Sequence, residues 1–76
     1  MSDIKKKPTP GQTVTLRALP KGFVDDLPEE DQRAMTAVVG RRIRLNRYEE
    51  DGRAELEFTD GNGIIHFVYV DPKYIE

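Results

Sequence analysis

The only histidine of the chain, His66, is the side chain best suited to acid–base chemistry at neutral pH. Catalysis by an imidazole needs a nucleophile or a second acid–base group positioned beside it. The only serine, Ser2, lies at the other end of the chain, and there is no cysteine. We therefore predict no catalytic residues and no enzyme activity, and we expect His66 to have a structural or interface role.

The segment Asp60-Gly61-Asn62-Gly63 resembles the opening of a calcium-binding loop. Such a loop is completed by a bidentate acid at its twelfth position. Here the ninth to eleventh positions, Val68-Tyr69-Val70, belong to a predicted strand, which carries the twelfth residue, Asp71, away from the turn. We therefore predict a hairpin turn at this segment, with no metal site.

A second group of carboxylates precedes and begins a predicted helix. Its members are Asp25, Asp26, Glu29, Glu30 and Asp31. A hard cation needs oxygens that converge on it, whereas acidic residues in a first helical turn interact with the positive end of the helix dipole. We predict helix capping here, with docking of a basic partner as the alternative, and no metal or cofactor.

The basic residues are concentrated in the strand 41–47 and just after it. They are Arg41, Arg42, Arg44, Arg47 and Arg53. Such a group could contact a nucleic-acid backbone. The neighbouring segments carry the acidic residues Glu49, Glu50, Asp51, Glu55 and Glu57, and the formal net charge of the chain is -2. We therefore expect neutralised pairs on one sheet face, with a nucleic-acid or ribosome contact through strand 41–47 as the alternative.

The chain of 76 residues has the length of one small domain. Residues 1–11 contain lysines, prolines and a glycine, and we predict a flexible N-terminal arm there and a folded domain over 12–76. No apolar run approaches the roughly 18 residues that span a bilayer, and the N-terminus has no apolar stretch typical of a secretory signal. The lack of cysteine suits a reducing compartment, so we expect a cytoplasmic protein with no membrane contact.

The alternation of apolar and polar residues from Thr13 to Leu19 predicts a half-buried strand. Pro28 suits the first turn of a helix, and Gly40 suits its C-terminal cap. Three apolar residues between them recur at helical spacing: Ala34, Met35 and Val38. We predict a helix near residues 28–38.

The remainder of the chain predicts a β-meander. A loop over Glu49–Gly52 would place Leu45 opposite Leu56 and Arg44 opposite Glu57, so that apolar and charged partners both match. A two-residue turn at Gly61-Asn62 would place Leu56 opposite Phe67, and a turn at Asn62-Gly63 would shift this pairing by two residues. Both registers predict that Leu56, Phe58 and Phe67 form the centre of the core.

The order strand, long loop with helix, three-strand meander, tight turn and closing strand resembles an SH3-like small barrel. The final Asp71-Pro72-Lys73-Tyr74-Ile75 resembles the turn and aromatic residue that end SH3 folds. This resemblance implies a mainly β fold, a five-stranded SH3-like barrel with one short helix inserted between the first and second strands. The aromatic motifs that grip proline-rich peptides are missing, so the resemblance does not imply proline-peptide binding.

The sequence pattern is similar to that of a set of short uncharacterised bacterial proteins with an SH3-like barrel. The similar segments are Leu27-Pro28-Glu29-Glu30-Asp31-Gln32, Val39-Gly40, Gly52-Arg53-Ala54-Glu55-Leu56-Glu57-Phe58, His66 and Val70-Asp71-Pro72. At the level of the fold, the barrel also resembles small β subunits that dock onto photosynthetic and thioredoxin-reductase partners, although a shared fold does not imply a shared function.

The strand 64–70 is apolar on both faces, with Ile65, Phe67 and Tyr69 on one and Ile64, Val68 and Val70 on the other. A strand of this kind is covered on both faces, by the helix or first strand, or by a partner. We therefore predict a non-enzymatic module that binds a protein partner or a second copy. The candidate partner-binding residues are Ile64, His66, Val68, Val70, Arg42 and Arg44.

Overall fold

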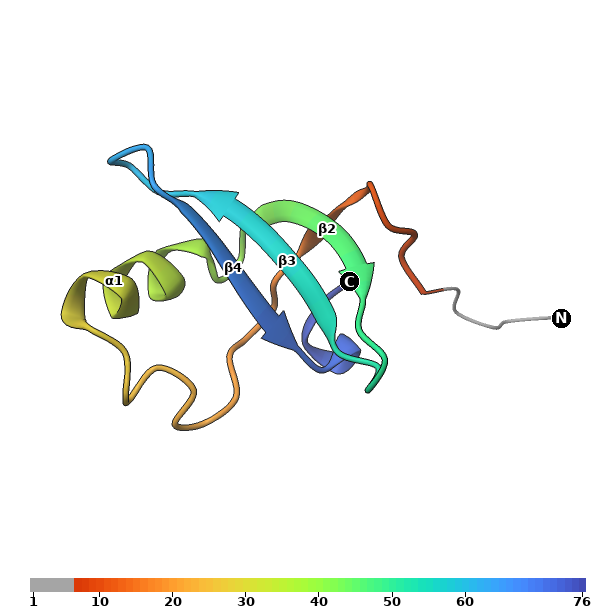
Figure 1. The fold of residues 1–76 in the computed structure, drawn as a ribbon, viewed down its shortest axis with the longest axis horizontal. Helices are drawn as coiled ribbons and strands as arrows, with labels where there is room; N and C mark the ends of the chain where they lie inside the picture. The colour runs from red at the N-terminus through yellow and green to blue at the C-terminus, as the bar shows by residue number, and fades with distance from the viewer. Residues whose placement is uncertain (1–6) are drawn as a thin grey trace, which may run out of the picture.

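The computed structural model describes residues 7–76 and contains one open sheet of four antiparallel strands and one α-helix (Figure 1). The strands are β1 (Thr13–Thr15), β2 (Arg42–Tyr48), β3 (Ala54–Thr59) and β4 (Ile65–Val70), and they lie side by side in this order. The helix α1 (Glu29–Val38) lies in the long connection between β1 and β2. A short 3₁₀-helix, η1 (Pro72–Tyr74), follows β4.

The predicted helix is confirmed, and its local signals explain its start. Pro28 precedes it with a φ of -56°, and three acidic residues occupy its first turn. Met35 and Val38 are buried against the sheet, while the opposite side of α1 faces solvent. Gly40 ends this region with a φ of 88°, a conformation that favours glycine.

The core lies between α1 and the inner face of the sheet. Its buried members on the strands and their neighbours are Val14, Leu16, Ile43, Leu45, Ala54, Leu56, Phe58, Val68, Val70 and Ile75. The predicted pairing of β2 with β3 is confirmed at Leu45 opposite Leu56 and Arg44 opposite Glu57. A bulge at Asn46 then shifts the register, so that Tyr48 lies opposite Ala54.

The prediction of a five-stranded SH3-like barrel is wrong, because the structure has four strands in a sheet that does not close. The missing strand is the last one, where only a single bridge forms, between Leu16 and Ile75. Residues 72–74 form η1, and Ile75 and Glu76 lie beside Leu16 and Thr15. Thr15 and Glu76 exchange two backbone hydrogen bonds, of 2.9 and 3.0 Å, at this edge.

The predicted turn between β3 and β4 is also wrong. The N–H of Asp60 donates to the carbonyl oxygen of Ile64 at 2.9 Å, and the N–H of Gly63 donates to that of Asp60 at 3.0 Å. Gly63 has a φ of 81°, so the turn has three residues and ends in a left-handed glycine. Compared with the registers predicted from two-residue turns, this three-residue turn shifts the pairing by one residue. Each side chain of β4 therefore lies on the opposite face from the one predicted.

The consequence of this shift is that Phe67 does not belong to the core. Leu56 lies opposite Val68 and Phe58 lies opposite His66, whereas Phe67 pairs with Glu57 on the outer face. The prediction that Phe67 forms part of the core centre is therefore wrong, although Leu56 and Phe58 are buried as expected.

Residues 7–11 of the predicted arm lie against β2. The hydroxyl of Tyr48 donates to the carbonyl oxygen of Pro8 at 2.7 Å, and the N–H of Gly11 donates to the carbonyl oxygen of Leu45 at 2.8 Å. The remainder of the predicted arm, residues 1–6, lies outside the described residues.

Candidate functional site

The outer face of β4 carries large apolar side chains in solvent. The exposed fractions of Ile64, Ile65 and Phe67 are 52%, 54% and 51%, and Tyr69 on the same face is half-buried. Ile65, Phe67 and Tyr69 alternate along β4 at the edge of the sheet, and Ile64 directly precedes the strand. Contiguous exposed apolar side chains are typical of interaction sites, whereas scattered ones are normal on any surface.

The residues predicted from the sequence to bind a partner do not form one surface. Val68 and Val70 are buried in the core, with exposed fractions of 2% and 1%. His66 is half-buried on the same inner face. Ile64 is exposed at the end of the turn, and Arg42 and Arg44 project from β2 on the outer face.

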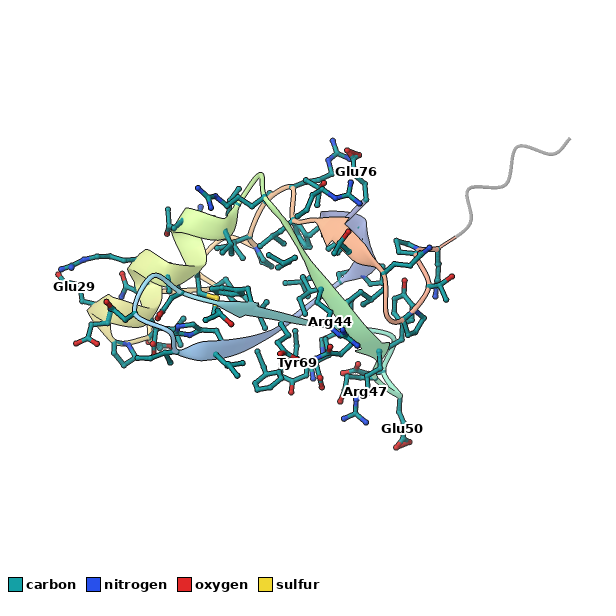
Figure 2. All side chains as sticks on the ribbon, turned by 90° about the horizontal axis from the view of Figure 1, so that it is seen from above. Glu29, Arg44, Arg47, Glu50, Tyr69 and Glu76 are labelled. Atoms are coloured by element: carbon teal, nitrogen blue, oxygen red, sulfur yellow. The ribbon has the colours of Figure 1, made fainter. Side chains whose placement is uncertain are left out.

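The sequence analysis did not name Ile65, Phe67 and Tyr69 as partner-binding residues, and it placed Phe67 in the core. The register brings one of the predicted residues near them, because Arg44 pairs with Glu57 and Glu57 pairs with Phe67. Figure 2 shows Arg44, Arg47 and Tyr69 on the same side of the sheet. The outer face thus has an apolar edge on β4 and a charged centre on β2 and β3.

Hydrogen bonds link the charged groups of this centre to one another. Asn46 donates from its side-chain nitrogen to Glu55 and to Glu57, at 3.0 Å each, and accepts from Arg44 at 3.0 Å. Arg47 lies 2.9 Å from Glu49 and 3.3 Å from Glu55. The bulge allows Asn46 and Arg47 both to lie on the side of Glu55, so that both side chains bond to its carboxylate.

These contacts shift the ionisation of the groups involved. The hydrogen bond from Asn46, with the charge of Arg47, lowers the pKa of Glu55. The charges of Glu49 and Glu55 raise the pKa of Arg47. Burial, followed by the charge of Glu55, raises the pKa of Tyr69. The carboxylates and this guanidinium are therefore paired with each other at neutral pH.

His66 lies at the other end of β4, where the turn meets the start of α1. Its Nε2 is 2.7 Å from Oδ2 of Asp60, and its ring stacks on Phe58 with centroids 5.0 Å apart. Asp31 of α1 is 4.0 Å from Nδ1 of His66. The other carboxylate oxygen of Asp60 accepts from the N–H groups of Asn62 and Ile64, so this cluster holds the three-residue turn in place.

We expect the Asp60 cluster to make the stability of the domain depend on acidic pH. Hydrogen bonds from His66 and from the N–H of Ile64 hold the pKa of Asp60 below its usual value of 3.8. A carboxylate with a lowered pKa in the folded state stabilises that state above its usual pKa, and this contribution disappears as the pH falls through the lowered value. The urea concentration at which half of the protein is unfolded should therefore decrease as the pH is lowered below about 4.

The variant Asp60→Asn should lose stability at neutral pH and show less of this decline. Glu50→Gln, at an exposed position of the other hairpin, is the control and should keep the decline of the wild-type protein. Equal pH profiles for Asp60→Asn and the wild-type protein would contradict the assignment to Asp60.

The described residues contain no group of three or more histidine, cysteine or acidic side chains arranged to hold a metal ion. A surface hollow of about 340 Å³ lies between α1 and the β3–β4 turn. Its charged lining residues include Arg33, which is already bonded to Glu29 at 2.8 Å, and Asp60, which is bonded to His66. The lining also contains Glu30 and Arg41, so the hollow carries charges of both signs and does not select a ligand of one charge.

Comparison of the chain with protein-family models, with curated proteins and with solved structures gave no match. Over residues 7–76, no helix has the length and apolar character needed to cross a bilayer. The function must therefore be argued from the surface of this chain.

Proposed function

We propose that this chain is a non-enzymatic protein-interaction module that accepts an extended protein segment along the edge of β4. The observation that carries the proposal is the row of exposed apolar side chains on that edge, with Ile65 and Phe67 each more than half exposed. In recognition by strand addition, main-chain hydrogen bonds provide affinity and alternate side chains provide specificity.

The backbone of β4 supports this mode of binding. The hydrogen bond from Asp60 to Ile64 fixes which residues of the hairpin face each other through their backbones. Because these pairs alternate along an antiparallel ladder, His66, Val68 and Val70 direct their N–H and C=O groups toward β3. Ile65, Phe67 and Tyr69 direct theirs toward the edge of the sheet, where no further strand of the described residues pairs with β4.

Backbone and side-chain features therefore coincide on the same residues. Ile65, Phe67 and Tyr69 have outward backbone groups and also carry the side chains of the exposed face. An added strand would gain main-chain hydrogen bonds from them and would cover their apolar surface. Its own alternate side chains would lie beside Phe67.

The charge arrangement favours a protein segment over a nucleic acid. Arg47 is paired with Glu49 and Glu55, and Glu57 lies between Arg44 and Phe67. A phosphate backbone near these arginines would also approach the carboxylates, which would repel it. The apolar edge itself, residues 65–70, contains no charged side chain.

Selection from a displayed library of random linear peptides tests the proposal. The bait is the wild-type protein at low concentration, and Phe67→Lys is the counter-bait, because a lysine at an exposed edge discourages strand pairing. We expect enriched peptides with alternating apolar residues that bind the wild-type protein and bind the variant at least tenfold more weakly. On binding, the amide resonances of Ile65, Phe67 and Tyr69 should shift more than those of His66 and Val68.

Two results would contradict the proposal. One is a library without enrichment, or with peptides that bind the two baits equally. The other is binding of single-stranded nucleic acid with an affinity that falls steeply with salt, which indicates contacts to phosphates.

A further inference from the structure

The edge of β4 lacks the features that normally keep sheet edges apart. Natural edge strands are protected by charged side chains, prolines, bulges or short length. The six residues of β4 include no charge and no proline, and their pairing with β3 runs without a bulge over all six positions. By contrast, β2 carries three charged side chains and a bulge.

The pattern of outward groups on β4 is self-complementary. The residues with outward backbone groups are Ile65, Phe67 and Tyr69, which are evenly spaced about Phe67. If a second β4 runs antiparallel with Phe67 opposite the partner's Phe67, then Ile65 lies opposite the partner's Tyr69. All outward N–H and C=O groups of both strands then find partners in one register. If one β4 is shifted by two residues along the other, only two of the residues Ile65, Phe67 and Tyr69 in each strand lie opposite a residue with outward backbone groups.

We propose that the extended segment bound by β4 is β4 of a second copy, paired antiparallel about a two-fold axis at Phe67. This inference rests on the proposed function, since it names the occupant of the same edge. The two sheets join into one continuous sheet of eight strands, and a two-fold interface of this kind is the commonest arrangement in homo-oligomers.

The side chains on the outer face fit this pairing. Phe67 meets the partner's Phe67 at the axis, and Ile65 meets the partner's Tyr69, so apolar and aromatic groups cover one another. The pairing ends where Gly63 of one copy lies opposite Asp71 of the other, and glycine presents no side chain there.

Electrostatic repulsion between the copies is weak in this arrangement. The carboxylate nearest the axis is that of Glu57, which pairs with Phe67. Three strand spacings separate Glu57 from the partner's Glu57, or about 14 Å. This distance exceeds the Debye length of about 8 Å at physiological ionic strength, so the two charges are largely screened.

Single cysteines test the register, because the wild-type chain has none. Residues that face each other across the axis in this register have Cα atoms about 5.5 Å apart, within the range of a disulfide. Phe67→Cys should therefore cross-link rapidly to a second copy under mild oxidation. Ile65→Cys is the matched control, because it has a similar exposed fraction but its Cα atom would lie about 14 Å from that of its counterpart.

Sedimentation of the wild-type protein over a concentration series gives the second measurement. We expect the mass to rise from one chain to two and to stop there, and Phe67→Lys to remain a monomer. Val39→Lys, at an exposed apolar position outside the sheet, should dimerise like the wild-type protein.

The inference fails if the two cysteine variants cross-link at equal rates, or if the wild-type protein stays a monomer throughout. If peptides selected against the β4 edge still bind such a monomer, the proposed function stands and only the second copy is excluded. If no peptide is selected either, both proposals fail.

Discussion

Lysine at Val68 should unfold the domain, whereas lysine at Phe67 should leave it folded. The two residues are neighbours on β4, but Val68 is buried with an exposed fraction of 2% and Phe67 is 51% exposed. An unpaired ammonium group in the core costs several kcal/mol, which is comparable with the whole stability of a small domain, about 5–15 kcal/mol. The Phe67→Lys change removes only surface contacts of the monomer.

Far-UV circular dichroism and urea unfolding, at concentrations where the protein is monomeric, distinguish the two variants. Val68→Lys should show little native signal, and Phe67→Lys should unfold close to the wild-type midpoint. The reverse result would mean that β4 pairs with β3 in one of the registers expected from a two-residue turn.

Truncation of Leu56 to alanine should cause a large loss of stability without any change in charge. Leu56 is fully buried at the centre of the sheet, between Leu45 on β2 and Val68 on β4. Removal of a buried leucine side chain costs about 2–5 kcal/mol, because the neighbours close only part of the cavity. In a domain of this size the melting temperature should fall by about 10 °C or more.

Thr59→Ala is the control for this experiment, because Thr59 is exposed at the end of the same strand. A surface substitution of this kind changes stability by about 0.5 kcal/mol or less. If the two variants melt at the same temperature, Leu56 is not at the centre of the core.

The helix and the first hairpin could be predicted because their signals are local. Pro28 and the acidic first turn mark the start of α1, and the opposed pairs Leu45–Leu56 and Arg44–Glu57 set one register for β2 and β3. The closing strand was predicted but does not form, because residues 72–74 adopt the 3₁₀-helix η1 and Ile75 makes a single bridge with Leu16.

The prediction for the second hairpin was wrong because the side chains of β4 do not indicate which of its faces packs on the core. Both faces of the strand are apolar, so either register would bury apolar side chains, and the hydrophobic pattern does not distinguish them. The turn length determines the register, and it depends on the positive φ of Gly63 and on the hydrogen bonds that the Asp60 carboxylate accepts from the N–H groups of Asn62 and Ile64. The sequence drew attention to β4 because both of its faces are apolar, but the turn directs Ile65 and Phe67, rather than Val68 and Val70, to solvent.

The C-terminal residues determine what kind of assembly this sheet can form. Glu76 bonds with Thr15, and the N–H of Arg17 donates to the carbonyl oxygen of Tyr74 at 2.7 Å, so the outer side of β1 is largely occupied. A subunit with a single open edge forms a closed pair, whereas a subunit with two open edges can add copies at both ends and grow into a filament. In the proposed pair, the short C-terminal segment would stop growth at β1, and its removal would open a second edge to further copies.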